Sequence, residues 1–296
     1  MKRNILFLND KTKLNKLYRS ALMDYLKING FKVSSIGLFD NNSSLFRSLL
    51  YLLCHPLINV VSSNLRTNCV VLLIVCLPGL VILNGMGRYR RFRLLRLYLL
   101  YMFVLNSRKA IAIQNYADYR YFRRYISMSA RLRLFWVSGS GGTNRTFGKC
   151  LGVEIIQRED KLELVSDSVC NAMTLFSLKR IAVVGCNSSI KLQRMIPGAY
   201  GVGYVRQQDI LSYGNIFLQP FGYGEGFPHS MSDALVSGMD VLITRKAYIS
   251  YGLYKLRAPV VQCTGEWYRV SPNNELKAII NIDNITKCYY NLILCD

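Results

Sequence analysis

Short apolar runs alternate with longer amphipathic segments along nearly the whole chain, and this alternation limits the possible folds more than any other feature. Residues 4–8 predict a strand, residues 13–28 carry a helical pattern, Asn29-Gly30 predicts a turn, and residues 31–36 predict a second strand. The chain therefore begins with a βαβ unit. Most of the later runs are apolar on both faces, as the strands of a buried parallel sheet are.

Further strands are predicted in both halves of the chain. They lie at 57–61, 80–83, 110–114 and 132–137, and then at 162–165, 180–184, 216–219, 241–244 and 260–262. Between the two groups, residues 138–144 are rich in Gly and polar side chains, a composition typical of a hinge. Because 296 residues suit two domains, we expect two doubly wound, Rossmann-like α/β domains, residues 1–140 and residues 141–296.

The charge balance favours anionic partners. The 38 Lys and Arg residues outnumber the 17 Asp and Glu residues, which gives a formal net charge of +21 and suits phosphates, lipid headgroups or nucleic acid. The nine cysteines are scattered, without CxxC pairs or metal-ligand spacing, so we expect a reduced cytoplasmic protein. We expect no signal peptide and no membrane span, because the longest apolar stretch, 69–83, is shorter than the roughly 20 residues a span needs.

The segment 215–244 combines a predicted strand, a Gly-rich loop, a helix and another strand. In open α/β sheets, ligands bind outside the carboxyl ends of strands, where a following helix directs free backbone N–H groups at an anion. Pro228 suits the helix start and Gly238 its end. Glu225 then lies in the loop and Asp233 in the helix, so both carboxylates can accept hydrogen bonds from sugar hydroxyls. Alternatively, Glu225 only caps the helix electrostatically, through its attraction to the helix dipole, and Asp233 is an ordinary solvated helix residue.

Residues 225–233 resemble the donor-site signature of family 4 glycosyltransferases, in which Glu-Gly-Phe-Pro opens a helix and a second acid follows eight positions after the first. Asp233 replaces the usual Glu. Residues 203–213 resemble the family too, and the resemblance is specific from Gly203 to Thr244. Less specific similarity is found at 4–19, 137–141 and 180–185, so that the resemblance extends over roughly residues 1 to 265. It implies a retaining enzyme of GT-B architecture, with an acceptor-side domain and a nucleotide-sugar-binding domain facing a cleft.

The resemblance also implies individual roles. Glu225 and His229 are the implied catalytic residues, although His229 equally suits an exposed helix position. Asp233 would hold the ribose, and residues 203–206 would border the base. The implied donor-binding residues are Gly203, Tyr204, Val205, Arg206, Tyr223, Gly224, Gly226, Phe227, Pro228, Ser230 and Asp233. The acceptor-side candidates are Asn9, Arg19, Gly85 and Arg88. The departing diphosphate can take the acceptor's proton, so we expect no strong base, no metal and no cofactor besides the nucleotide sugar.

One position departs from the family pattern. The family usually places an Arg and a Lys after the first strand of the second domain, where they neutralise the diphosphate, whereas this chain has Asp167 there. Lys179, Arg180 and Arg206 are the nearest cations in sequence. Either such cations substitute, or the chain is a catalytically degenerate relative that still binds sugar nucleotides.

Residues 87–109 place cations at both ends of an apolar helical pattern. The first group is Arg88, Arg90, Arg91, Arg93 and Arg96, and the second is Arg108 and Lys109. Together with the apolar segment 44–53, this arrangement predicts a helix lying in the headgroup layer of a membrane. The alternative is a helix buried in the protein whose arginines reach water. A basic nucleic-acid-binding protein is a third possibility, but no RNP-like strand, helix-turn-helix or GXXG clamp is present.

The expected function is therefore a retaining hexosyltransferase that moves a sugar from a nucleotide sugar to a lipid-linked saccharide in bacterial surface-polysaccharide synthesis. We expect it to be peripheral on the cytoplasmic face of the plasma membrane. Its expected partners are the nucleotide sugar, the lipid-linked acceptor and the anionic membrane surface, and not nucleic acid.

Overall fold

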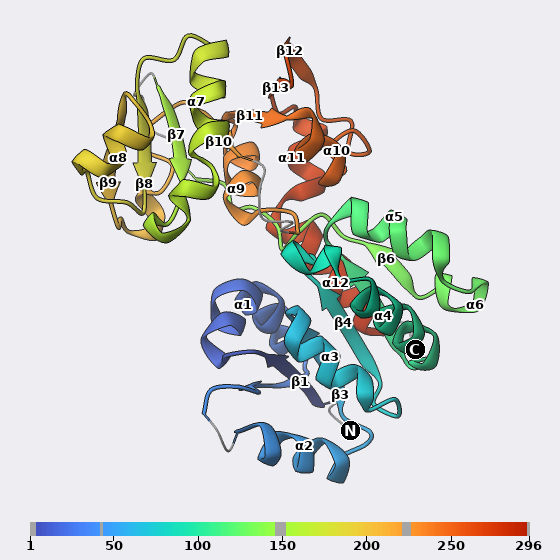
Figure 1. Ribbon diagram of the computed structural model, residues 1–296. Helices are drawn as coiled ribbons and strands as arrows, with labels where there is room; N and C mark the ends of the chain where they lie inside the picture. Colours follow the sequence, from blue (N-terminus) through green and yellow to red (C-terminus); the bar gives the residue numbers. More distant parts are fainter. Residues whose placement is uncertain (1–3, 42–43, 146–151, 221–225, 295–296) are drawn as a thin grey trace. The chain divides into compact units, whose positions relative to one another are not determined.

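The computed structural model describes residues 4–41, 44–145, 152–220 and 226–294. These residues form two compact units, each built on its own sheet (Figure 1). The first unit contains the described residues 4–140, 226–227 and 282–294. The second contains the described residues 141–220 and 228–281. Both units are α/β, as the alternation in the sequence predicts.

The first unit has a six-stranded sheet in the order β2-β1-β3-β4-β5-β6, in which every pair of neighbours is parallel. Its strands are β1 (Asn4–Asn9), β2 (Lys32–Gly37), β3 (Asn59–Ser63), β4 (Gly79–Leu83), β5 (Lys109–Ile113) and β6 (Leu134–Trp136). Its helices are α1 (Thr12–Ile28), α2 (Ser44–Cys54), α3 (Leu65–Leu73), the 3-10 helix η1 (Gly87–Arg91), α4 (Arg93–Leu105), α5 (Tyr116–Tyr125), α6 (Met128–Arg131) and α12 (Ile282–Leu294).

Helices cover both faces of this first sheet because side chains alternate along each strand. Ile5 and Phe7 of β1 belong to a buried cluster with α1 and α12, whereas Leu6 and Leu8 belong to one with α2 and α3. In the parallel register, Leu8 pairs with Ser62 of β3, and Ser62 pairs with Val81 of β4. Val81 packs against α4, so α4 lies on the same sheet face as Leu8. Thus α2, α3 and α4 share one face, and α1 and α12 cover the other.

The second unit has a seven-stranded sheet in the order β12-β13-β11-β10-β7-β8-β9. Its strands are β7 (Val153–Ile156), β8 (Ile181–Val184), β9 (Ala199–Gly203), β10 (Ile216–Gln219), β11 (Asp240–Thr244), β12 (Val260–Thr264) and β13 (Trp267–Val270). Its helices are η2 (Glu159–Leu164, 3-10), α7 (Ser166–Leu175), α8 (Ile190–Met195), η3 (Gln207–Asp209, 3-10), α9 (His229–Ser237), α10 (Arg245–Ser250) and α11 (Asn274–Ile280). The five strands from β11 to β9 run parallel, whereas β13 is antiparallel to both of its neighbours.

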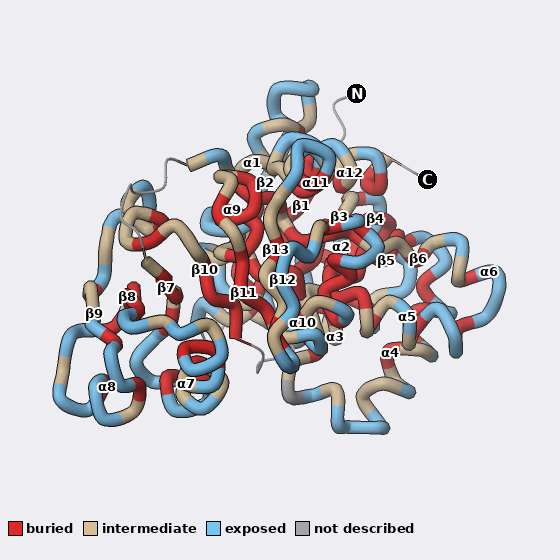
Figure 2. Tube along the Cα trace, turned by 90° about the horizontal axis from the view of Figure 1, so that it is seen from above, coloured by how far each residue is buried: buried red, intermediate tan, exposed pale blue. Residues whose placement is uncertain are grey.

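Burial follows the strands in both units. Figure 2 shows the buried segments along strands such as β10 and β11, and exposed segments on the outer sides of helices such as α8. In the second unit, α7 and α8 pack on one sheet face around Val169 and Leu192. Trp267 on β13 joins the same cluster and is almost fully buried. Among the described residues, no helix is both long enough and apolar enough to cross a membrane.

Several predicted strands differ from the structure. Residues 162–165 do not form a strand, since η2 occupies Glu159–Leu164. Leu162 and Val165 are buried while Glu163 and Leu164 are exposed, a spacing of three that suits one helical turn. The strands β7, β9 and β13 were not predicted, because Glu154, the glycines of β9 and the polar residues of β13 interrupt their apolar pattern.

The predicted second domain, residues 141–296, differs from the structure at its end, where α12 belongs to the first unit. One face of α12 carries Ile285, Tyr289 and Ile293, which are buried in the cluster that also contains Leu22 of α1. Tyr290 adds an edge contact with Tyr25, at 5.1 Å between ring centroids. The apolar face of α12 is visible in the sequence, but the sheet that it covers is a property of tertiary packing.

Candidate functional site

The junction between β10 and α9 is where the sequence predicts a donor site. Glu225, the main predicted catalytic residue, and the donor-binding candidates Tyr223 and Gly224 lie outside the described residues. The chain is described again from Gly226; Pro228 is buried, and α9 begins directly after it at His229. The predicted helix end is confirmed, since Gly238 follows α9 in the left-handed conformation at φ 98°.

The described part of the motif is divided between the two units. Gly226 and Phe227 belong to the first unit and are buried there, whereas Pro228 and α9, with the candidates His229 and Ser230 half-buried, belong to the second. A Cβ atom on Gly226 would lie 1.7 Å from the carbonyl oxygen of Asn84 and 2.7 Å from Oε1 of Gln114. The glycine is therefore required because another backbone passes directly against it.

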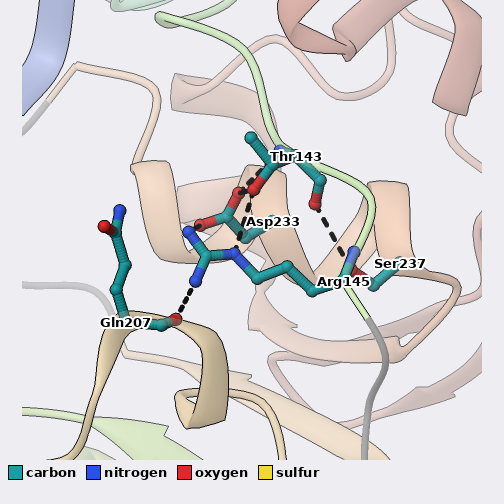
Figure 3. Close-up of polar contacts among 5 residues, drawn as sticks. All are labelled: Thr143, Arg145, Gln207, Asp233 and Ser237. Atoms are coloured by element: carbon teal, nitrogen blue, oxygen red, sulfur yellow. Dashed lines mark hydrogen bonds and ion pairs between the residues drawn. The ribbon is translucent and has the colours of Figure 1, made fainter.

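Asp233 is held by the segment that precedes the first strand of the second unit (Figure 3). Its Oδ1 accepts hydrogen bonds from the backbone N–H of Thr143 at 2.7 Å and from the Thr143 hydroxyl at 3.0 Å. Its Oδ2 lies 3.3 Å from a guanidinium nitrogen of Arg145. Burial raises the pKa of Asp233, and the bonds from Thr143 and the charge of Arg145 oppose that rise. Thr143 and Arg145 thus hold the carboxyl group of Asp233 in a half-buried place.

Arg145 connects three segments of the second unit (Figure 3). Besides the ion pair with Asp233 on α9, its guanidinium donates to the Thr143 hydroxyl at 2.9 Å and to the carbonyl oxygen of Gln207. Its backbone N–H donates to Ser237 Oγ at 2.8 Å, and its side chain is only 14% exposed. The sequence analysis missed Arg145, because it follows the Gly-rich segment and not a strand.

Close packing explains how that Gly-rich segment reaches α9. A Cβ atom on Gly142 would lie 2.4 Å from the carbonyl oxygen of Ser232. The N–H of Gly142 donates to the carbonyl oxygen of Ile280 at 3.1 Å. Gly142 therefore has a packing role at α9 in addition to the flexibility that its composition predicts.

The predicted base-bordering residues lie at the carboxyl end of β9. Gly203 is buried and has a left-handed backbone conformation with φ +79°. Its N–H donates to the carbonyl oxygen of Cys186 at 2.7 Å. Tyr204 is 83% exposed, Val205 is half-buried and Arg206 is exposed. The next residue, Gln207, is the one that Arg145 binds. These residues thus form a strand end with an exposed aromatic ring and a cation.

Two of the three cations suggested to replace the family's Arg and Lys are misplaced. Lys179 and Arg180 precede β8, so they stand at the amino ends of the parallel strands, whereas α9 begins beyond the carboxyl end of β10. Both edges belong to one sheet, and ligands of open α/β sheets bind at the carboxyl edge. Asp167 lies exposed in the first turn of α7. Of the suggested residues, only Arg206 follows a carboxyl strand end.

In the first unit, the acceptor-side candidates Asn9 and Arg19 meet in one buried polar network. Arg19 is 3% exposed and donates to Ser63 Oγ at 3.2 Å, to Asn84 Oδ1 at 2.9 Å and to the Ser140 hydroxyl. Its guanidinium also lies 5.4 Å from the ring centroid of Tyr289. Burial lowers the pKa of Arg19. Arg19 therefore holds Ser63, Asn84 and Ser140 in place through direct hydrogen bonds.

Asn9 enters the same network through amides that the sequence analysis missed. Its Oδ1 accepts from Asn64 Nδ2 at 2.6 Å, and Asn64 Oδ1 accepts from Asn84 at 2.8 Å. Asn64 has a left-handed φ of 72°, which is uncommon outside glycine and is often found at functional sites. Asn64, Asn84 and Gln114 each directly follow an observed strand, β3, β4 and β5. Of the three, only Asn84 also directly follows a predicted strand, 80–83, so a signal was available in the sequence for Asn84 alone.

Gly85, another acceptor-side candidate, follows Asn84 and is half-buried, while the side chain of Arg88 lies outside the described residues. Among the described residues, no group of three or more His, Cys, Asp or Glu side chains could hold a metal ion.

Solved structures of glycosyltransferases share this fold. A glycosyltransferase from Rickettsia africae aligns with a TM-score of 0.52 and 10% identity over 100% of both chains. HepE from Anabaena in complex with UDP aligns with a TM-score of 0.54 and 12% identity, covering 99% of this chain and 96% of HepE. HepE with UDP and glucose aligns with a TM-score of 0.55 and 11% identity over 98% and 95% of the two chains. No family model matches the sequence, and no curated protein matches it.

Proposed function

We propose that the chain is a glycosyltransferase that takes its sugar from a nucleotide-sugar donor bound at the carboxyl edge of the second sheet. The observation that carries the proposal is the arrangement at α9, where Asp233, Arg145 and the residues after β9 are joined by direct contacts. A nucleotide diphosphate requires a helix start or cations for its phosphates and acceptors for its ribose hydroxyls. The fold shared with glycosyltransferase structures supports this assignment.

Arg145 is proposed to supply the positive charge that Asp167 cannot. A guanidinium has five N–H donors, and the contacts to Thr143, Gln207 and Asp233 leave some of them for a phosphate oxygen. Because Asp233 and Thr143 hold its orientation, little reorganisation is needed when a phosphate arrives. Asp233 then has two tasks, which are to orient Arg145 and to accept a hydrogen bond from the ribose.

The finer features of the proposal come from the family resemblance. Glu225 and His229 act at the donor sugar, transfer retains the anomeric configuration, and the acceptor is a lipid-linked saccharide of a surface polysaccharide. On the first unit, Asn64 and Asn84 stand half-buried at the carboxyl strand ends and present neutral amides. Amides suit the hydroxyl groups of a saccharide, since each can both donate and accept.

The test of the donor site compares binding of a diphosphate with binding of its nucleoside. Isothermal titration with a panel of nucleoside diphosphates, UDP among them, identifies the base, and Arg145→Gln is then measured with that diphosphate and with the nucleoside alone. We expect roughly tenfold or greater loss for the diphosphate and little change for the nucleoside, because only the diphosphate bears the charge that Arg145 meets. Arg257→Gln is the control, since Arg257 is 82% exposed in the same unit.

Equal losses for diphosphate and nucleoside would mean that Arg145 only holds the fold, and wild-type binding would remove it from the site. Glu225→Gln should depress sugar transfer while diphosphate binding changes little. Binding of a nucleotide sugar without transfer or hydrolysis would assign the chain to the degenerate class. Selective RNA binding without affinity for any nucleotide sugar would overturn the enzyme proposal.

Association with an anionic membrane is proposed for the face of the first unit that carries α2 and α4. Leu94, Leu97, Tyr101 and Val104 form an exposed stripe along α4, with Leu94 82% exposed. Leu99, Met102 and Phe103 of the same helix are buried. On α2, Phe46, Leu50 and Leu53 are exposed. One side of α4 is therefore buried in the protein, and its other side is an exposed apolar stripe. The helix has features of both predicted alternatives, a helix buried in the protein and a helix at a membrane surface.

The contacts of the arginines change the membrane test. Arg90 forms a 2.7 Å ion pair with the buried Asp118, and Arg96 lies 4.8 Å from the ring centroid of Tyr121, so both have structural partners. Arg91 and Arg93 are exposed. We expect the wild type to float with anionic liposomes at low salt and Arg91→Gln/Arg93→Gln to float less, at about 1 kcal/mol per cation. Arg124→Gln is the control, and equal flotation of wild type and double variant would exclude this face.

A further inference from the structure

A cavity of about 680 Å³ opens at the amino ends of the strands of the first unit. Residues at or just before the starts of β1, β3, β4, β5 and β6 line it, so we call it the amino-edge pocket. Asn64, Asn84 and Gln114 follow the opposite, carboxyl ends of β3, β4 and β5. The amino-edge pocket is therefore separate from the candidate acceptor network, and the proposed donor and acceptor sites make no use of it.

The charged side chains that line the pocket all have the same sign. They are Arg108, Lys109 and Arg133, and no Asp or Glu lies among the lining residues that the structure describes. Lys109 is fully buried, with its Nζ donating to the carbonyl oxygen of Ile74 at 2.7 Å and to Asn106 Oδ1 at 2.5 Å. These partners are neutral oxygens, whereas buried charges in proteins are normally paired with an opposite charge. The site thus holds cations whose counter-charge the lining residues do not supply.

The two arginines can supply hydrogen bonds to an anion. Arg108 donates to the carbonyl oxygen of Cys76 at 3.1 Å. Arg133 donates to the carbonyl oxygens of Lys109 at 3.1 Å, of Phe103 at 3.3 Å and of Asn106. These bonds fix both guanidinium groups and leave further N–H donors on each. Burial, together with the charge of Arg108, lowers the pKa of Lys109 to about 8. An anion in the pocket would oppose both effects.

The remaining lining residues include the polar Asn4, Asn59 and Ser107 and a group of apolar side chains. Leu57 and Leu132 are 81% and 80% exposed, and Phe135 is half-buried beside them. The volume lies in the range of about 300 to 1,000 Å³ that small-molecule sites occupy. A ligand that satisfies both parts has an anionic head for the arginines and an apolar body for the leucines.

We propose that the amino-edge pocket binds an amphiphilic phosphate, a phosphomonoester with an apolar chain, at a site separate from the sugar-transfer site. The phosphate meets Arg108 and Arg133, and the chain lies against Leu57, Leu132 and Phe135. Guanidinium groups favour phosphate because two parallel N–H groups match two phosphate oxygens. The inference stands on the charges and shape of the first unit alone, and does not depend on the proposed donor site.

The test uses the full chain and three probes: octyl phosphate, inorganic phosphate and octanol. Calorimetric titration should detect octyl phosphate and give at least tenfold weaker binding for each of the other two probes. Arg108→Gln, at an exposed position, should weaken octyl phosphate about tenfold, as expected for loss of one charged hydrogen-bonding partner. Leu132→Asn should weaken octyl phosphate but not inorganic phosphate. Arg124→Gln, on α5 of the same unit, should bind as the wild type does.

A second measurement does not rely on these variants. NMR titration of lysine ammonium groups should show the pKa of Lys109 rising when octyl phosphate is added and staying constant with octanol. Vesicles that contain phosphatidic acid distinguish the source of the ligand: flotation that depends on Arg108 assigns a bilayer lipid, and binding of monomeric octyl phosphate alone assigns a free amphiphile. Equal affinity of wild type and Arg108→Gln, equal binding of inorganic and octyl phosphate, or an unchanged Lys109 pKa would overturn the proposal.

Discussion

Replacement of Glu154 by Gln should stabilise the second unit, increasingly so as the pH rises. Glu154 lies on β7 with 0% exposure, where its Oε2 accepts the N–H of Tyr213 at 2.9 Å. Its Oε1 is buried without a hydrogen-bond partner among the described residues. Burial raises the pKa of Glu154 to about 7, against the opposing backbone hydrogen bonds from Tyr213 and Gly214. The folded protein therefore favours the protonated carboxyl group.

The sign and size of the effect follow from this pKa. Below pH 4.5 the carboxyl group is protonated in both states, and ionisation adds no penalty to the folded state. Between pH 4.5 and 7 the unfolded chain releases its proton first, so the free energy of unfolding falls with pH. Each unit of pKa difference corresponds to about 1.4 kcal/mol, so the penalty approaches about 3 kcal/mol by pH 8.

Urea unfolding of wild type and Glu154→Gln at several pH values between about 5 and 8 measures this difference. A Trp136→Phe background leaves Trp267, in the core of the second unit, as the tryptophan reporter. The stability advantage of Glu154→Gln should grow by about 2 to 3 kcal/mol over that range, and titrations shared with the wild type cancel in the difference. Glu163→Gln, 73% exposed, should show no such trend. An advantage that is constant with pH, or largest at pH 5, would refute the reasoning.

Two further perturbations probe packing. Gly142→Ala should lower the melting temperature of the second unit and weaken diphosphate binding, because its Cβ would lie 2.4 Å from the Ser232 carbonyl oxygen; unchanged melting and binding would refute the close approach. Asp118→Ala should destabilise the first unit by about 2 kcal/mol in urea unfolding, since it removes the partner of Arg90 and of the Met86 N–H. Asp24→Ala is the control, because it removes an ion pair with Lys27 that is exposed on α1. A loss of stability in Asp118→Ala no larger than in this control would contradict the structural role assigned to Asp118.

Patterns of neighbouring residues determined much of the fold. The apolar runs of β1, β4, β5, β10 and β11 are recognisable because parallel strands buried on both faces are apolar at nearly every position between their ends. Pro228, expected in the first helical turn, precedes α9 in an extended conformation, whereas the end of α9 follows from Gly238, whose left-handed conformation is a local preference. Such features need no knowledge of what packs against them, and the sequence was sufficient to predict them.

Tertiary structure alone decided which segments meet. The face of α12 is evident from its apolar spacing, yet only packing assigns it to the first sheet. Lys179 and Arg180 are near Asp167 in sequence, but they precede β8 and so lie at the amino edge of the sheet, opposite the edge where α9 begins. Arg145 is 88 positions before Asp233 and meets it because Gly142 lets the chain approach α9. Side-chain chemistry can be predicted from residue types, but partners that are distant in sequence are set by the path of the chain between them.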